Sequence, residues 1–109
     1  DCNFQILDPM AYRDLLDQIA KSKFVITDSG GLIKEAYWLE KPSLSIMRKP
    51  VWPELLDANV SYNAAPLHQD IINVFQKLEL IKIFKKGIFG FGDTSKRIVD
   101  IIIKNYKTE

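Results

Sequence analysis

The stretch KFVITDSGGLIKEA, residues 23–36, decides how this chain folds. Near its start, Phe24–Ile26 is a short apolar run with β-branched residues, which is typical of a buried strand in a parallel sheet. Asp28 and Ser29 are residue types that cap helix N-termini, and the two glycines after them remove side chains where the helix begins. We therefore predict a strand, a tight polar turn and a helix.

The first turn of this predicted helix is a candidate anion site. Its backbone N–H groups have no intrahelical partner, and the positive end of the helix dipole lies there. Gly30 and Gly31 would let a phosphate approach the amides, because no Cβ stands in the way. The alternative is an ordinary strand–helix turn whose glycines only permit the bend, and the turn by itself favours neither interpretation. It matches neither the dinucleotide fingerprint nor the P-loop.

Composition restricts the classes of function that are open to the chain. Its 109 residues form one domain at most, and 47% apolar with 27% charged residues argue against disorder. A net charge of +1 gives no electrostatic reason to expect nucleic acid or an anionic membrane as partner. The single cysteine, Cys2, excludes an internal disulfide and is typical of a reducing compartment, so we expect a cytoplasmic protein. No apolar run reaches the roughly 20 residues that span a bilayer.

Strand and helix patterns alternate along the chain. Three further strands are expected at Phe4–Leu7, Ser43–Met47 and Val60–Ala64. Helices are expected at residues 11–21, 31–39, 55–58, 71–78 and 94–106, whereas Leu80–Phe84 is either helix or strand. This order predicts an α/β fold: a three-layer, Rossmann-like parallel sheet of about four strands with helices on both faces. Ligands of such sheets bind beyond the carboxyl ends of the strands, which is where Ser29 and Arg48 fall.

Several linked motifs resemble one known family. The motifs are Thr27-Asp28-Ser29-Gly30-Gly31, Glu35-Ala36, Lys41-Pro42, Asp8-Pro9 with Tyr12, Arg48, Pro53-Glu54, and Gly90-x-Gly92-x-x-Ser95-x-Arg97-Ile98. Their order and spacing resemble those of the non-hydrolysing UDP-N-acetylglucosamine 2-epimerases over most of the chain. There are two departures. Glu40 stands where the family usually has glycine, and Lys49–Trp52 replaces an acidic-threonine core and a second arginine.

The resemblance implies a role for each matching residue. It implies phosphate binding by Ser29, Gly30, Gly31 and Arg48, ribose binding by Glu35, and a uracil region at Met10 and Leu15. The residues by themselves also permit plainer roles. Glu35 could be a solvated helix glutamate, and Met10 and Leu15 could be core residues.

The resemblance also implies an activity. UDP-N-acetylglucosamine and UDP-N-acetylmannosamine would be interconverted in the cytoplasm by elimination and re-addition of UDP, without a metal or other cofactor, for cell-envelope polysaccharide biosynthesis. The expected partners are UDP, a UDP-N-acetylhexosamine and a second copy in a homodimer. Residues 1–109 match the later part of the C-terminal domain of a GT-B-type two-domain isomerase. We therefore expect a UDP-binding fragment that is inactive alone.

Two other functions stay open at this point. One is the donor-binding half of a GT-B glycosyltransferase, which shares this architecture and a phosphate-binding helix start. The other is a non-catalytic module for nucleotide-sugar binding or subunit association. The expected strand Phe4–Leu7 would leave one sheet edge open, which would favour dimerisation.

Overall fold

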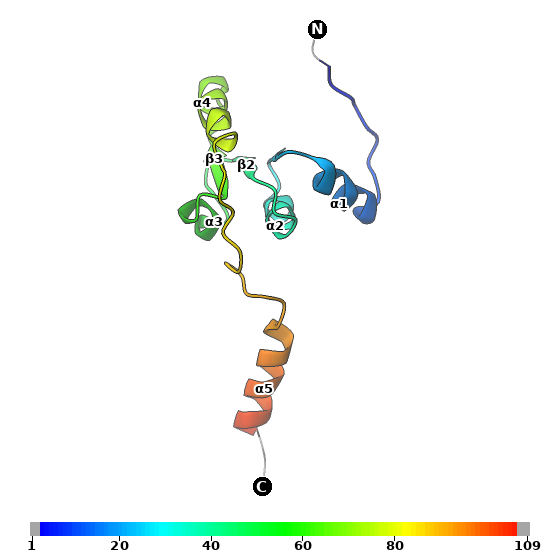
Figure 1. The fold of residues 1–109 in the computed structure, drawn as a ribbon, viewed down its shortest axis with the longest axis vertical. Coiled ribbons are helices and arrows are strands. Elements are labelled where there is room, and N and C mark those ends of the chain that lie inside the picture. Colours follow the sequence, from blue (N-terminus) through cyan, green and yellow to red (C-terminus); the bar gives the residue numbers. More distant parts are fainter. Residues whose placement is uncertain (1–2, 107–109) are drawn as a thin grey trace.

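The computed structural model describes residues 3–106 and confirms the α/β architecture (Figure 1). Three short strands, β1 (Val25–Thr27), β2 (Ser43–Ile46) and β3 (Ser61–Ala64), form one parallel sheet in the order β1-β2-β3. Parallel neighbours need a crossover connection, and here each connection contains a helix. Cys2 lies outside the described residues.

Helices cover both faces of the sheet, as predicted. They are α1 (Tyr12–Lys21), α2 (Gly30–Trp38), α3 (Pro53–Asp57), α4 (His68–Leu78) and α5 (Thr94–Tyr106). On one face, α2 and α3 share a core cluster that contains Ile33, Tyr37 and Leu55. On the other face, Leu44 packs against Leu78 of α4. The helix α1 packs against α2, which extends the layer on the first face.

Polar side chains join β2 to β3 on the face that carries α2. The Ser43 hydroxyl donates to Ser61 Oγ over 2.9 Å, and the Ser45 hydroxyl donates to Asn63 Oδ1 over 2.6 Å. The Asn63 amide then donates to the Met47 carbonyl over 2.9 Å, which fixes the chain as it leaves β2. In the part of the chain that the structure describes, no buried side-chain nitrogen or oxygen lacks a partner. These side-chain hydrogen bonds therefore help to fix the register of β2 against β3, and none of the described buried polar groups is left without a partner.

The strand predicted at Phe4–Leu7 is wrong. This segment is irregular, and Phe4 and Ile6 are 72% and 88% exposed. An apolar run becomes a strand only where a neighbouring strand offers hydrogen-bond partners, and no strand among residues 3–106 pairs with it. The sheet therefore has three strands rather than about four, and the predicted dimer edge at this segment loses its basis. Leu80–Phe84 is also irregular, neither helix nor strand.

The chain is more extended than a compact domain of its length. Its radius of gyration is 17.6 Å, whereas about 13 Å is usual for a compact domain of roughly 100 residues. Figure 1 shows that the N-terminal segment and α5 project away from the sheet. The bounds of α5 confirm the predicted helix, but none of its residues is buried, and Ile98, Ile101 and Ile102 are at least half exposed. No helix among the described residues is long and apolar enough to span a membrane.

The end of α2 confirms that Glu40 occupies a glycine position. Its φ is +58°, in the left-handed region. The Glu40 amide donates to the Tyr37 carbonyl and the Lys41 amide donates to the Ala36 carbonyl, both over 2.9 Å. This hydrogen-bond pair is the Schellman motif, which usually carries glycine at the left-handed residue. The Glu40 carboxylate lies 2.6 Å from the Lys86 ammonium.

Glycine at position 40 is expected to stabilise the chain. Glu40→Gly removes a left-handed strain of about 1–2 kcal/mol, offset by greater freedom in the unfolded chain and by loss of an exposed ion pair worth about 0–1 kcal/mol. We expect a net gain of up to about 1 kcal/mol in the free energy of unfolding, measured by urea titration. Glu40→Ala is the control, because it loses the ion pair and keeps the strain. A Glu40→Gly chain that is no more stable than Glu40→Ala would contradict this interpretation.

Candidate functional site

The first turn of α2 lies just beyond the carboxyl end of β1. Ser29 is the N-cap residue: its backbone is extended and its Oγ accepts from the Leu32 amide over 3.4 Å. The Ser29 amide donates to Thr27 Oγ1 over 3.0 Å. The amides of Gly30 and Gly31, which lie between Ser29 and Leu32, have no hydrogen-bond partner among the described residues. The turn thus offers two adjacent free donors at the positive end of the helix dipole.

The two glycines have different surroundings. A Cβ at Gly30 would lie 3.4 Å from Val51 Cγ1, an ordinary van der Waals distance, so Val51 of the loop after β2 lies next to this glycine. A Cβ at Gly31 would meet only Ser29 Oγ, at 3.9 Å, and Gly31 is exposed. Gly30 is therefore covered on one side by Val51, whereas Gly31 faces solvent. The sequence pattern did not distinguish these surroundings.

Glu35 lies one helical turn further along α2 and contacts Tyr12. A hydrogen bond from the Tyr12 hydroxyl to the Glu35 carboxylate, with partial desolvation and the negative charge of Glu35, raises the pKa of Tyr12 above its ordinary value of 10.0. Tyr12 begins α1, so this contact places the start of α1 beside the first turns of α2. Sequence reasoning noted Tyr12 as part of a motif and missed its contact with Glu35.

The two residues assigned to a uracil region differ in their surroundings. Leu15 is partly buried and packs against the cluster of Ile19, Val25 and Ala36, so it contributes to the core. Met10 is half-buried and lies two residues before Tyr12, in the segment that leads into α1. Met10 is therefore the nearer of the two in sequence to the Tyr12–Glu35 contact.

Arg48 lies beyond the carboxyl end of β2, on the same side of the sheet as the first turn of α2. It follows β2 by two residues, and β2 is the parallel neighbour of β1. The Arg48 side chain is exposed, and neither of the ion pairs within residues 3–106 involves it. The structure thus places Arg48 beyond the carboxyl ends of the strands, as predicted, with its side chain exposed to solvent.

Trp52 contacts the α2 turn directly. Its indole Nε1 donates to the Gly30 carbonyl over 2.8 Å. The Lys34 ammonium lies 4.2 Å from the centroid of the Trp52 ring and 4.4 Å from that of Phe89. The two rings meet edge to face, with centroids 5.7 Å apart. Local sequence patterns do not predict this cluster, because its members come from three separate segments of the chain.

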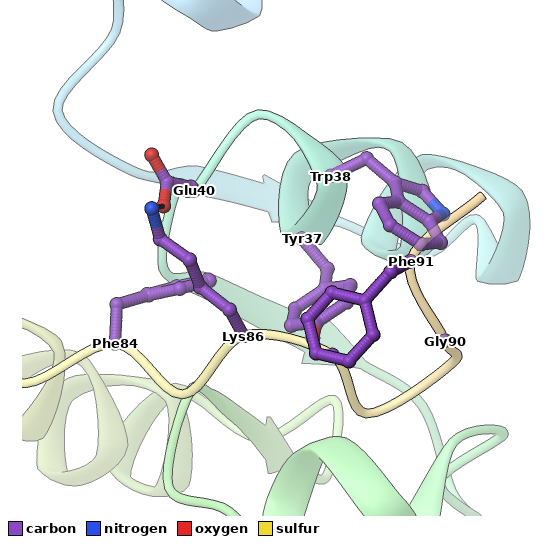
Figure 2. A pocket seen from close by; sticks show the side chains of 8 residues that line it. Tyr37, Trp38, Glu40, Phe84, Lys86, Gly90 and Phe91 are labelled. Atoms are coloured by element: carbon purple, nitrogen blue, oxygen red, sulfur yellow. Dashed lines mark ion pairs between the residues drawn. The ribbon is translucent and has the colours of Figure 1, made fainter.

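A cavity of about 330 Å³ lies at the other end of α2 (Figure 2). Its lining residues are Tyr37, Trp38, Glu40, Phe84, Lys86, Gly87, Gly90 and Phe91. Figure 2 shows the Glu40 carboxylate beside the Lys86 ammonium, and the Phe91 ring next to Tyr37. None of the residues of the first turn of α2 lines it, so this cavity is separate from the candidate anion site. Within residues 3–106, no group of three or more His, Cys, Asp or Glu residues is placed to hold a metal ion.

Comparison with known proteins identifies one family. The sequence model of the family described as UDP-N-acetylglucosamine 2-epimerase matches residues 1–103. A UDP-N-acetylglucosamine 2-epimerase of Campylobacter jejuni is 34% identical over 98% of this chain and 30% of its own length. A UDP-2,3-diacetamido-2,3-dideoxy-D-glucuronate 2-epimerase of Pseudomonas aeruginosa is 33% identical over 92% of this chain and 28% of its own length.

Solved structures give the same result. A UDP-GlcNAc 2-epimerase of Methanocaldococcus jannaschii, in complex with UDP-GlcNAc and UDP, superposes with a TM-score of 0.78 at 26% identity. The superposition covers 92% of this chain and 28% of the Methanocaldococcus jannaschii chain. The Neisseria meningitidis enzyme bound to UDP-GlcNAc superposes with a TM-score of 0.72 at 28% identity, over 91% of this chain and 29% of that structure. The chain thus spans less than a third of the length of these relatives.

Proposed function

Because this chain belongs to the UDP-N-acetylglucosamine 2-epimerase family, we propose that it forms the UDP-binding part of an enzyme that inverts C2 of a UDP-N-acetylhexosamine. The observation that carries the proposal is the open first turn of α2, where the Gly30 and Gly31 amides are free among the described residues. Solved relatives that bind UDP-GlcNAc and UDP support it.

The proposed substrate is UDP-N-acetylglucosamine, and the product is UDP-N-acetylmannosamine. One relative is named for UDP-2,3-diacetamido-2,3-dideoxy-D-glucuronate. The names of the relatives therefore have in common a UDP-linked sugar that is epimerised at C2. For this reason we assign the UDP moiety to residues of this chain and leave recognition of the sugar to the rest of the enzyme.

The proposed work of the chain is to hold UDP as it leaves. Elimination breaks the C1–O bond and removes the C2 proton, which gives a glycal and UDP. A proton is then delivered to the opposite face of C2 as UDP adds back. During bond breaking, negative charge grows on the diphosphate, and fixed amide donors with a helix dipole stabilise that charge. In this proposal, Gly30 and Gly31 donate their amides, Ser29 holds the turn as its cap, and Arg48 supplies a nearby cation.

Glu35 is proposed to bind the ribose. A carboxylate has two acceptor oxygens, so it can accept from both hydroxyls of a vicinal diol. The start of α1 lies close to this carboxylate, since Glu35 raises the pKa of the Tyr12 hydroxyl above its ordinary value. Met10 and Leu15, before and within α1, border the proposed uracil region.

Replacing Glu35 separates ribose recognition from phosphate recognition. We expect Glu35→Ala to weaken UDP binding by about tenfold or more, because a hydrogen bond to a charged group contributes about 1.5–3 kcal/mol. The affinity for inorganic diphosphate should stay unchanged, because that anion has no ribose. Isothermal titration calorimetry with both ligands measures this difference. Glu79→Ala is the matched control: a helix-terminal, exposed glutamate whose ion pair with Lys23 is 3.7 Å long. Equal losses for UDP and diphosphate would remove the ribose assignment.

The remaining parts of the proposal concern the whole enzyme. We propose that the whole enzyme is a two-domain isomerase that forms a cytoplasmic homodimer. These 109 residues are one segment of its C-terminal domain, and the groups that transfer the proton lie outside them. The 109-residue chain alone would then bind UDP without epimerising UDP-N-acetylglucosamine. The glycosyltransferase alternative has no support from the relatives, which are named as epimerases.

A further inference from the structure

Three segments that are far apart in the sequence meet beside the first turn of α2. They are the turn itself, the loop of residues 48–52 after β2, and the glycine-rich loop of residues 85–93. Trp52 connects all three, because its indole N–H donates to the Gly30 carbonyl and its ring contacts Lys34 and Phe89. We call Trp52, Lys34 and Phe89 the aromatic clamp.

The Lys34 ammonium in this cluster is held by aromatic rings and not by an ion pair. Neither ion pair in the described part of the chain involves Lys34. Its ammonium instead lies against two ring faces, at 4.2 Å and 4.4 Å from their centroids, and all three side chains are half-buried. A cation between two aromatic rings attracts both, so Lys34 fastens the two loops to α2.

The contact affects the position of the loop over the candidate site. Val51, next to Trp52, lies beside Gly30: a Cβ built on that glycine would be 3.4 Å from Val51 Cγ1. Arg48 lies at the start of the same loop, and the Asn63–Met47 hydrogen bond holds the chain just before it. One end of the loop is therefore fixed by the sheet and the other end by Trp52.

We propose that Trp52 is a positioning residue for diphosphate recognition, which holds the loop of residues 48–52 on the first turn of α2 through the aromatic clamp. The inference rests on the proposed function, since it concerns the same UDP site. It assigns a role to a residue at which this chain departs from its family's pattern. Without the indole N–H, the loop can move away from Gly30, and the amides and Arg48 no longer share one fixed arrangement.

The test uses two variants of the clamp and one matched control. Trp52→Phe keeps an aromatic ring for Lys34 and Phe89 and removes the N–H donor, whereas Lys34→Met removes the charge and keeps a long chain. Trp38→Phe is the control, because Trp38 is the chain's other tryptophan and lies in the last turn of the same helix. Affinities for UDP and for uridine are measured by NMR titration, and backbone ¹⁵N order parameters of Lys49 and Val51, in the loop of residues 48–52, are measured without ligand.

We expect Trp52→Phe to weaken UDP binding by about tenfold, because one positioning hydrogen bond is lost. Uridine has no phosphate, so its affinity should change by less than about twofold. The order parameters of Lys49 and Val51 should fall in the ligand-free variant, because the loop is no longer held on α2. Lys34→Met should act in the same direction with a smaller effect, and Trp38→Phe should change neither the affinities nor the order parameters.

Two results would overturn the inference. One is a Trp52→Phe chain that binds UDP as tightly as the wild type. The other is an equal loss for UDP and uridine, which would indicate a general loss of structure. If the wild type binds no UDP, the proposed function fails, and the ligand-free relaxation experiment decides the clamp separately. Unchanged order parameters of Lys49 and Val51 in Trp52→Phe would then refute the clamp, and lower values would support it.

Discussion

Replacing Gly31 with aspartate is expected to weaken UDP binding strongly and to leave the chain folded. The added carboxylate would lie beside the amides that we assign to the diphosphate. Two like charges about 4 Å apart repel by about 4 kcal/mol at an effective dielectric constant of about 20. Since 1.4 kcal/mol corresponds to a factor of ten, we expect UDP affinity to fall by at least about 100-fold in calorimetric titration.

The fold should tolerate this change. A Cβ at Gly31 would have no neighbour nearer than Ser29 Oγ, at 3.9 Å, and Gly31 is not among the glycines with positive φ. A negative charge in the first turn of a helix is favourable to its dipole, so thermal stability should be equal or higher. Gly31→Asn is the matched control, because it adds almost the same volume without the charge. If Gly31→Asp bound UDP as well as Gly31→Asn, the diphosphate would not lie at this turn.

Replacing Leu44 with alanine is expected to have the largest effect on stability. Leu44 lies in the central strand, is fully buried, and packs in the cluster that contains Ala64 and Leu78. Such a truncation loses hydrophobic transfer energy and leaves a cavity, which together cost about 2–5 kcal/mol. Because whole small domains are stable by only about 5–15 kcal/mol, this loss is a large share of the free energy of unfolding.

The measurement for Leu44→Ala is urea denaturation followed by circular dichroism. Leu67→Ala is the matched control: the same substitution at a residue that is 61% exposed, just before α4. We expect the control to stay within about 0.5 kcal/mol of the wild type. A Leu44→Ala chain as stable as Leu67→Ala would show that β2 is not the centre of the core.

Local patterns predicted the elements that carry their own signals. The helix α5 has its predicted bounds because its apolar spacing and polar flanks are both local. The strand and helix around residues 23–36 were predicted within one residue of β1 and α2, since Ser29 caps the helix as its type suggested. The resemblance places glycine where Glu40 stands, and the structure shows that this residue is left-handed all the same.

The failures have one physical cause, which is dependence on distant partners. Phe4–Leu7 has a strand-like composition, yet a strand needs a neighbour, and none in residues 3–106 pairs with it. The exposed apolar residues of α5 likewise have no covering element in the part of the chain that the structure describes. Composition cannot reveal whether such a partner is present.

The candidate site also combines features that a local motif predicts with contacts that only the fold reveals. Gly30 and Gly31 were identified from a local motif, but only the fold reveals that Gly30 packs on Val51 while Gly31 faces solvent. The Trp52–Gly30 hydrogen bond joins residues 22 positions apart, so no local pattern could predict it. The contact between Tyr12 and Glu35 joins two helices in the same way.

The most direct test of the UDP site is an NMR titration of the uniformly ¹⁵N-labelled chain with UDP. Assignment of the Gly30 and Gly31 amides, followed through saturation, locates the ligand without any substitution. We predict that these two amides shift most and saturably, with smaller shifts at Glu35 and Tyr12. Saturable shifts confined to the Tyr37–Phe91 cavity, or no shifts in the folded chain, would contradict the assignment of UDP to the first turn of α2.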